Sequence, residues 1–183
     1  MESLRGHLLI ASPRLPDANF YRSVVLIIHH DEQGAFGVVL NRPTNNTVAE
    51  IWEMVSDQPC KCAQPINVGG PVAGPLMALH TNQACSENEI IPGVHFATHR
   101  DHLNRIVRDP GGPFRIFSGY AGWAAGQLEA ELKVGGWMTL PASSEYVFSD
   151  ADTMWKRASQ EVGSRITRPL LGPLAMPDDP SLN

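Results

Sequence analysis

The chain has 183 residues, of which 43% are hydrophobic and 18% charged. This composition supports one packed domain and excludes a disordered or fibrous chain. Its 14 Lys and Arg residues are scattered among 19 Asp and Glu residues, giving a formal net charge of −5. Proteins that bind duplex nucleic acid usually concentrate basic residues to displace counterions from phosphates, so the sequence disfavours direct nucleic-acid binding.

The N-terminal region and the cysteines indicate a cellular location. The apolar run Leu8 to Ala11 is far shorter than a signal-peptide core, and no stretch approaches the length of a membrane span. An odd number of cysteines (Cys60, Cys62 and Cys85) without an export signal is typical of a reducing cytosol. We therefore expect a cytoplasmic protein that does not associate with the membrane.

The first half of the chain is dominated by strand patterns. Residues 7–11 (HLLIA) are typical of a short buried strand, and residues 22–29 form a β-branched run suited to burial on both faces. After a tight turn, residues 35–41 complete a predicted antiparallel hairpin. A helix should then begin at Thr47, because Thr47 and Glu50 have the spacing of a capping box. Its predicted buried face consists of apolar residues at helical spacing: Val48, Ile51, Trp52 and Val55.

The second half alternates short strands and helices. The predicted elements are strands at 65–68, 76–80 and 93–97, a helix capped by Thr98, a strand at 114–118, a helix at 125–133, a strand at 136–140 and a helix at 151–162. The sequence Gly119-Tyr120-Ala121-Gly122-Trp123 predicts a glycine-rich loop between the strand and the helix that flank it.

These elements predict the fold class and the domain organisation. Because strands and helices are interleaved without a regular β-α-β rhythm, we expect an α+β fold with a mixed sheet. Residues 1–168 should form a single domain. The prolines that recur from Pro169 to Pro180 predict a flexible C-terminal tail over residues 169–183.

The segment from strand to glycine loop to helix is the first candidate binding site. Backbone amides at a helix N-terminus can hold an anion, and glycines allow a ligand to approach the backbone closely. The candidate residues of this segment are Gly119, Tyr120, Gly122 and Gln127. The spacing of the glycines, G-x-x-G-x-x-x-G, matches neither a Walker A loop nor the dinucleotide-binding fingerprint. The alternative interpretation is that small residues here let the helix pack tightly on its strand.

The sequence Asn41-Arg42-Pro43, at the end of the predicted hairpin, is the second candidate. Pro43 restricts Arg42 to extended geometry, and the Arg42 guanidinium can form a bidentate pair with an anion. One interpretation is a structural loop clamp. The other is half of an anion site, with Arg22 or Arg14 as the second half.

Histidines and cysteines carry weaker signals. Only His99 and His102 should share a helical face, and no zinc-binding spacing is present. The pair Cys60-x-Cys62 departs from the usual zinc knuckle, although an exposed thiol there could be redox-sensitive. No serine-nucleophile motif occurs. We therefore assign no metal, no cofactor and no catalytic residue from the sequence.

Several motifs together resemble those of the YqgE/AlgH family of bacterial proteins. They are Asn19-Phe20-x-Arg22-Ser23-Val24-Val25, Gly37-Val38-Val39-x-Asn41-Arg42-Pro43, Gly69-Gly70-Pro71 and Gly119-Tyr120-Ala121-Gly122-Trp123-x-x-Gly126-Gln127-Leu128-Glu129-x-Glu131. The match runs from about residue 5 to 163. One departure is Ala124, where the family often has glycine. The resemblance implies an α+β fold with a curved, bifurcated, mixed and largely antiparallel sheet surrounded by helices, and it carries over no catalytic residues.

Two functions follow as hypotheses. The first is a non-enzymatic regulatory role exercised through an unidentified protein partner, because no nucleophile–base pair, metal set or phosphate loop passes the spacing tests. The second is a protein, or a weak enzyme, that binds a small anionic ligand. Its site would join Arg22, Asn41 and Arg42 to the 119–127 glycine segment.

Overall fold

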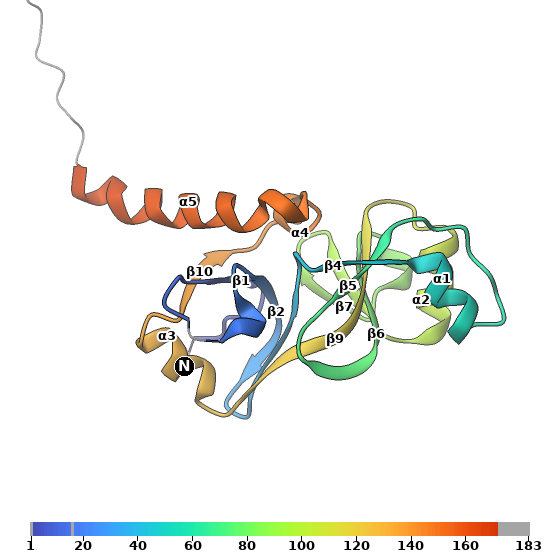
Figure 1. The fold of residues 1–183 in the computed structure, drawn as a ribbon, viewed down its shortest axis with the longest axis horizontal. Coiled ribbons are helices and arrows are strands. Elements are labelled where there is room, and N and C mark those ends of the chain that lie inside the picture. The colour runs from blue at the N-terminus through green and yellow to red at the C-terminus, as the bar shows by residue number, and fades with distance from the viewer. Residues whose placement is uncertain (1, 16, 172–183) are drawn as a thin grey trace, which may run out of the picture.

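The fold is organised around one long strand, β9 (Phe114–Ala124), in a computed structural model that describes residues 2–15 and 17–171 (Figure 1). One edge of β9 pairs antiparallel with β6 (Val72–His80). The other edge pairs first in parallel with β5 (Pro65–Val68) and then antiparallel with β3 (Gly34–Val39). Two strands therefore share one edge of β9, and this is where the sheet bifurcates.

The remaining strands extend the sheet on both sides. The hydrogen-bonded order is β10-β1-β2-β3-β9-β6-β8-β7, and β4 joins the sheet through β5. These strands are β1 (His7–Ala11), β2 (Val24–Asp31), β4 (Pro43–Thr47), β7 (Asn88–Ile91), β8 (Val94–Ala97) and β10 (Trp137–Pro141). Apart from the β5–β9 pair, every ladder is antiparallel in the part of the chain that the structure describes. The predicted α+β fold with a curved, bifurcated, mixed sheet is confirmed.

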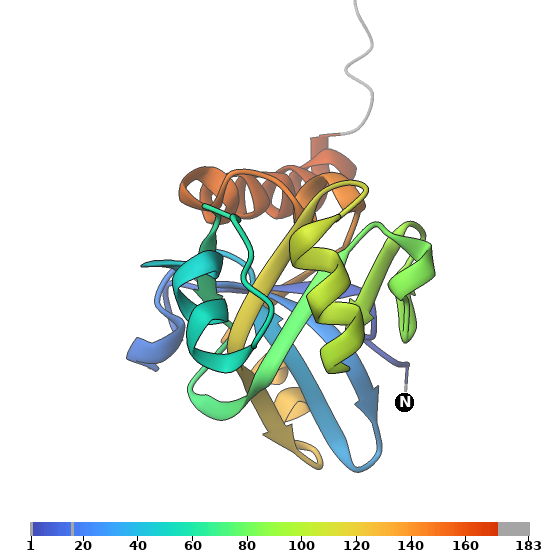
Figure 2. The same cartoon turned by 90° about the vertical axis from the view of Figure 1, so that its right-hand side faces the viewer.

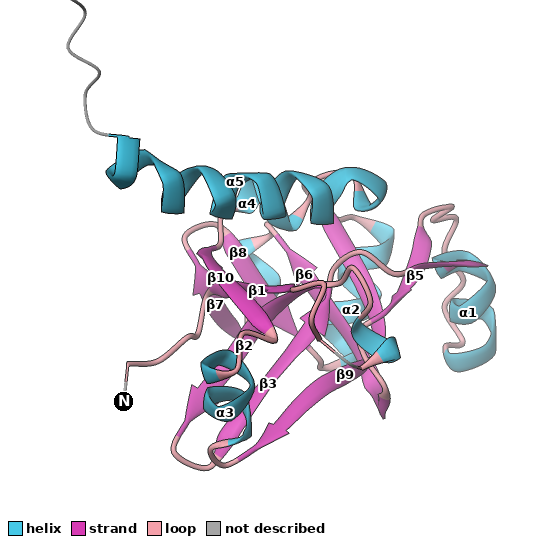
Figure 3. Ribbon diagram, turned by 60° about the vertical axis from the view of Figure 1, so that its left-hand side comes forward, coloured by secondary structure: helices cyan, strands magenta, loops and turns pink. Residues whose placement is uncertain are grey.

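Helices cover the sheet from several sides. They are α1 (Val48–Val55), α2 (Arg100–Arg108), α3 (Gln127–Lys133), α4 (Ser144–Val147) and α5 (Ala151–Leu171), with short 3₁₀ turns at Ala18–Phe20 and Gln83–Cys85. Figure 2 shows α1 and α2 in front of the strands around β6 and β9, whereas Figure 3 shows α5 and α3 on opposite sides of β1 and β10. No helix in the described ranges is both long enough and apolar enough to cross a membrane.

The alternation of side chains along β1 explains the position of α5 and α3. Leu8 and Ile10 belong to a core cluster with Met154 of α5, whereas Leu9 belongs to a second cluster with Leu128 of α3. Successive side chains of a strand point to opposite faces, so a strand that is apolar at every position must be covered twice. A third cluster lies beneath α1 and α2.

Helix α1 begins as predicted, but fewer of its apolar side chains are buried than predicted. The Thr47 side chain accepts a hydrogen bond from the Glu50 amide, and the Glu50 carboxylate accepts one from the Thr47 amide at 2.7 Å, which completes the capping box. Val48 and Trp52 are buried, but Val55 is exposed because the helix ends there and the chain turns away. Thr98 does not cap α2. Instead, the Glu87 carboxylate accepts hydrogen bonds from the Thr98 and His99 amides.

The predicted glycine loop at 119–123 is wrong, because β9 continues without interruption from Phe114 to Ala124. The backbone of Gly69 and Gly70, after β5, crosses this part of β9 at close range. A Cβ atom on Gly69 would lie 2.1 Å from the Gly119 carbonyl oxygen, and one on Gly70 would lie 2.2 Å from the Tyr120 carbonyl carbon. Such distances exclude any side chain, so Gly69 and Gly70 let the connection between β5 and β6 pass close to β9.

Helix α5 extends well past its predicted end at residue 162. Met154, Ala158 and Val162 are buried as predicted, and the helix continues to Leu171. The predicted domain boundary after residue 168 falls within this helix. Most of the predicted flexible tail, residues 172–183, lies outside the described residues.

Candidate functional site

Asn41 fixes the end of the hairpin to the start of β2. Its side-chain oxygen accepts a hydrogen bond from the Val24 amide, and its side-chain nitrogen donates one to the Arg22 carbonyl, both at 2.9 Å. Arg42 donates to the carbonyl oxygens of Tyr21 and Asn41. The loop clamp considered for Asn41-Arg42-Pro43 is therefore present, and it holds the Arg42 side chain beside Arg22.

Arg22 has a backbone conformation that few residues adopt. Its φ of 52° is the only positive φ among the non-glycine residues that the structure describes. The left-handed conformation costs a residue with a Cβ about 1–2 kcal/mol. The Arg22 guanidinium lies over the rings of Tyr21 and Trp155, 5.1 and 5.4 Å from their centroids. Backbone and ring contacts together direct this cation toward the N-terminal part of α5.

These side chains line a cavity of about 530 Å³, which we call the cationic pocket. It is lined by Arg22, Asn41, Arg42, Ala151, Asp152, Trp155 and Lys156. Three cations and one carboxylate meet here. Within the described part of the chain, none of the three cations forms an ion pair with a carboxylate. Burial lowers the pKa of Arg42, but a guanidinium remains charged at neutral pH.

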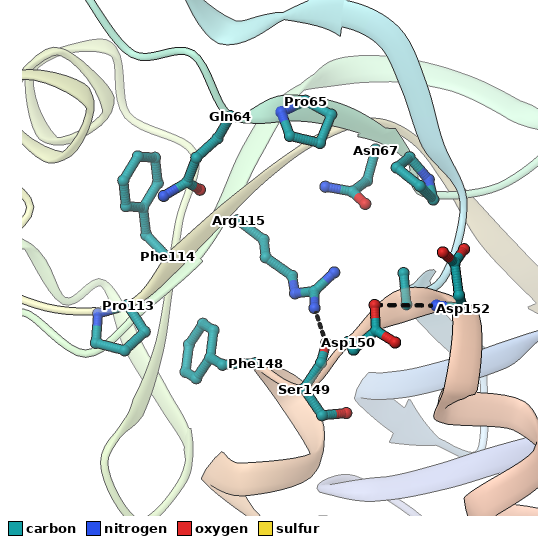
Figure 4. Close-up of a pocket in the computed structure, with 12 residues that line it drawn as sticks. Gln64, Pro65, Asn67, Pro113, Phe114, Arg115, Phe148, Ser149, Asp150 and Asp152 are labelled. Atoms are coloured by element: carbon teal, nitrogen blue, oxygen red, sulfur yellow. Dashed lines mark hydrogen bonds between the residues drawn. The ribbon is translucent and has the colours of Figure 1, made fainter.

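A second cavity, of about 450 Å³, adjoins the first and is called here the amide pocket (Figure 4). It is lined by Pro43, Gln64, Pro65, Asn67, Pro113, Phe114, Arg115, Phe148, Ser149, Asp150, Ala151 and Asp152. The two pockets share Ala151 and Asp152 at the start of α5. The sequence Arg42-Pro43 also passes between them, with Arg42 in the cationic pocket and Pro43 in the amide pocket.

Arg115 enters the amide pocket from β9. Its guanidinium donates hydrogen bonds to the carbonyl oxygens of Leu40, at 3.0 Å, and of Ser149. Burial lowers the pKa of Arg115, and the charge of Asp150 acts in the opposite direction. In Figure 4 the guanidinium points into the open space between Asn67, Phe148 and Asp150. Arg115 therefore places a positive charge and a planar group inside the pocket.

The glycine segment contributes to a different cavity. Gly122 and Gln127 line a space of about 330 Å³ together with Trp123 and Glu131, whereas Gly119 and Tyr120 line none of these three cavities. The Gln127 side chain accepts a hydrogen bond from the Ala124 amide and donates one to Glu131, both at 3.0 Å. The structure thus brings Arg22, Asn41 and Arg42 together and separates them from the 119–127 segment. The candidate site therefore consists of the hairpin and α5 side chains without the 119–127 segment.

Several residues of the two pockets carry no sequence signal. Lys156, Asp152 and Trp155 come from α5, and Asn67 and Arg115 come from β5 and β9. None of them belongs to a motif with the hairpin residues, because the chain brings these elements together only when the sheet closes under α5. In the described ranges, no group of three or more His, Cys, Asp or Glu side chains is arranged to hold a metal ion.

The fold and the two pockets define an α+β protein with a bifurcated sheet and a cationic cleft at the start of its C-terminal helix. The sequence profile of the AlgH-like family matches residues 8–167, and the chain belongs to this family. A UPF0301 protein of Saccharophagus degradans is 37% identical over 168 residues, covering 88% of this chain and 83% of the relative. Another, from Chlorobaculum tepidum, is 38% identical over 165 residues and 86% of each chain.

Two solved structures resemble this fold. The solution structure of the AlgH protein from Pseudomonas aeruginosa superposes with a TM-score of 0.75 and 34% identity, covering 95% of both chains. A crystal structure of a Corynebacterium diphtheriae protein gives a TM-score of 0.71 at 26% identity, covering 88% of this chain and 87% of that one. The names of these four relatives state no specific biochemical function.

Proposed function

We propose that this protein binds a small anionic ligand, with phosphate or carboxylate groups, in the cationic pocket, and that it acts as a binding protein without catalysing a reaction. One observation carries the proposal. The side chains of Arg22, Arg42 and Lys156 line one cavity with a single carboxylate, Asp152, and none of the cations is ion-paired within the described residues.

Like charges that lie close together raise the free energy of the folded protein. Cations that line one cavity repel each other, and this repulsion weakens folding unless an anion relieves it. An incoming anion receives charge-assisted hydrogen bonds that are about twice as strong as neutral ones. Arg22 keeps its position despite an unfavourable φ of 52°. Backbone strain of this kind is often retained where function requires it.

Calorimetric titration of the full chain tests the proposal, with tripolyphosphate and citrate as probes. We expect at least one probe to bind, with an affinity that falls at least tenfold in Arg22→Asn and Lys156→Gln. Asparagine tolerates the left-handed conformation of residue 22 better than most residues, so this substitution removes the charge without adding strain. Lys133→Gln removes an exposed positive charge on α3 and should have no effect. If neither probe binds at low salt, the proposal is refuted.

A regulatory role through a protein partner is the second candidate function. Aromatic side chains often anchor a partner, but they do not favour this role here, because Phe20, Trp52, Trp123 and Trp137 are buried in the core. Exposed side chains of α1 favour it instead, since Met54 is 72% exposed and Val55 48% exposed. Such side chains often contact a partner.

Affinity purification with the intact protein as bait tests this second role. A partner should be recovered reproducibly, and the double substitution Met54→Ser and Val55→Ser should reduce its recovery. Val134→Ser, which changes an apolar residue that is 77% exposed and belongs to another surface, serves as the control. If no protein is recovered reproducibly, or if both variants recover it equally, this role loses its support.

A further inference from the structure

We propose that the anionic ligand is a nucleotide, with its phosphates in the cationic pocket and its base in the amide pocket. This inference rests on the proposed function and names the ligand class. It starts from the arrangement of the two pockets, which share Ala151 and Asp152 and have Arg42-Pro43 between them. A ligand that fills both must be anionic at one end and carry a hydrogen-bonding group at the other.

The amide pocket contains an unsatisfied acceptor. Asn67 is only 2% exposed, and its side-chain nitrogen donates to the Ile116 carbonyl at 3.3 Å. Its side-chain oxygen is buried and has no hydrogen-bond partner in the described structure. A buried acceptor without a partner is costly, and such groups are rare in folded proteins. Figure 4 shows the Asn67 amide facing the space that Arg115 also enters. An N–H group of a ligand would satisfy this oxygen.

The other groups of the amide pocket suit a flat ring. The aromatic rings of Phe114 and Phe148 and the planar guanidinium of Arg115 line the same cavity. Nucleobases stack on aromatic rings and on guanidinium planes, while amide side chains bind their polar edges. The exposed Gln64 supplies a second amide to the same cavity. A ligand with a flat ring and polar edges uses all of these groups.

The shared residue Asp152 and the three cations complete the match. Asp152 lines both cavities, where the sugar of a nucleotide would lie. A carboxylate can accept hydrogen bonds from ribose hydroxyls, as one does in dinucleotide-binding folds. Arg22, Arg42 and Lys156 line only the cationic pocket of the two and suit the phosphates. Inorganic polyphosphate or a simple carboxylate would leave the Asn67 oxygen and the aromatic rings without a partner.

Calorimetry on the full chain separates this inference from the proposed function. The probes are ATP, GTP, CTP and UTP, each measured separately, with tripolyphosphate and adenosine as reference ligands. We expect at least one nucleoside triphosphate to bind at least tenfold more tightly than tripolyphosphate. Lys156→Gln should weaken both kinds of ligand. Gln64→Ala and Asn67→Leu should weaken only the nucleotide and bring it close to tripolyphosphate.

Nuclear magnetic resonance provides a second measurement, because Asn67→Leu changes a buried residue and could unfold the protein. In the unsubstituted protein, the nucleotide should shift the side-chain amide signals of Gln64 and Asn67, and tripolyphosphate should leave them in place. If tripolyphosphate binds as tightly as every nucleotide and these signals do not move, the nucleotide inference is overturned while anion binding stands. If neither kind of probe binds, both proposals are overturned.

Discussion

The imidazole ring of His80 lies 5.8 Å, from centroid to centroid, from that of His95, its partner in the β6–β8 ladder. Both side chains are buried in the sheet. Burial and the neighbouring His95 lower the pKa of His80 from 6.5 to about 4. This histidine is therefore neutral in the folded protein at pH values where it is protonated in the unfolded chain.

The first prediction concerns stability in acid. Between pH 6.5 and about 4 the unfolded chain binds a proton at His80 that the folded protein does not. The free energy of unfolding should therefore fall as the pH falls through this window, by on the order of 3 kcal/mol. Urea unfolding at several pH values measures the effect. His80→Leu should reduce the pH dependence, and His29→Gln, at an exposed site, should not. Equal slopes for His80→Leu and the unsubstituted protein would contradict the assignment.

The second prediction concerns Glu131 of α3. Its carboxylate accepts hydrogen bonds from the indole nitrogens of Trp123, at 3.0 Å, and Trp137, at 2.7 Å. Glu131→Ala leaves two indole donors without a partner and should lower the free energy of unfolding by roughly 2–4 kcal/mol. Glu131→Gln keeps an acceptor and should cost about 1 kcal/mol.

Urea unfolding followed by tryptophan fluorescence measures both Glu131 variants. Glu145→Ala is the control, because Glu145 is on the surface and its side chain is 84% exposed. Its substitution should change stability by less than about 0.5 kcal/mol. If Glu131→Ala is no more destabilising than Glu145→Ala, the indole contacts do not stabilise the fold.

The third prediction compares two glycines with nearly the same φ. Gly119 has φ +73° and Gly135 has φ +76°. A Cβ on Gly119 would lie 2.8 Å from the Val72 carbonyl oxygen, whereas one on Gly135 meets no atom within 4 Å. Gly135→Ala should therefore lower the free energy of unfolding by about 1 kcal/mol, which is the cost of a left-handed backbone at a residue with a Cβ. Gly119→Ala adds a clash with backbone and should cost roughly 2–4 kcal/mol. Thermal unfolding of both variants measures the difference. Equal losses of stability would contradict the close approach of the β6 backbone to Gly119.

The fourth prediction separates stability from binding at Arg22. Arg22→Gly removes a left-handed residue that costs about 1–2 kcal/mol and also removes ring contacts of about 0.5–1 kcal/mol. The free energy of unfolding should therefore change by no more than about 1 kcal/mol, while anion affinity falls at least tenfold. Urea unfolding and calorimetry on the same sample measure both quantities. A large loss of stability would mean that Arg22 is retained for folding and not for binding.

The fifth prediction concerns Cys62, considered above as a redox-sensitive thiol. Burial, the largest effect, and the neighbouring Cys60 raise the pKa of the Cys62 thiol, which leaves less of the reactive thiolate at neutral pH. Cys60 and Cys85 are buried. The native protein should therefore react with Ellman's reagent more slowly than glutathione does at pH 7. Protein unfolded in urea should react rapidly at all three thiols. A fast-reacting thiol in the native protein that is lost in Cys62→Ala would overturn this expectation.

Short stretches of the sequence determined those helices and strands whose characteristic residues lie close together in the chain. Continuous apolar runs identified β1 and the first strand of the β2–β3 hairpin, because a strand that is buried on both faces is apolar at successive positions. The capping box of Thr47 and Glu50 identified the start of α1, since its partners are three residues apart. Motifs along the chain also identified the family, and with it the fold.

Tertiary structure alone decided where the glycines and the cations act. Residues 119–123 have the composition of a loop, but they form a strand because they pair with β3 and β6, while Gly69 and Gly70 pass close beside them. Likewise, Arg42 and Lys156 line one cavity although more than a hundred residues separate them in the sequence. Their proximity depends on α5 packing against the sheet through long-range contacts, and such contacts leave no pattern in any short stretch of sequence.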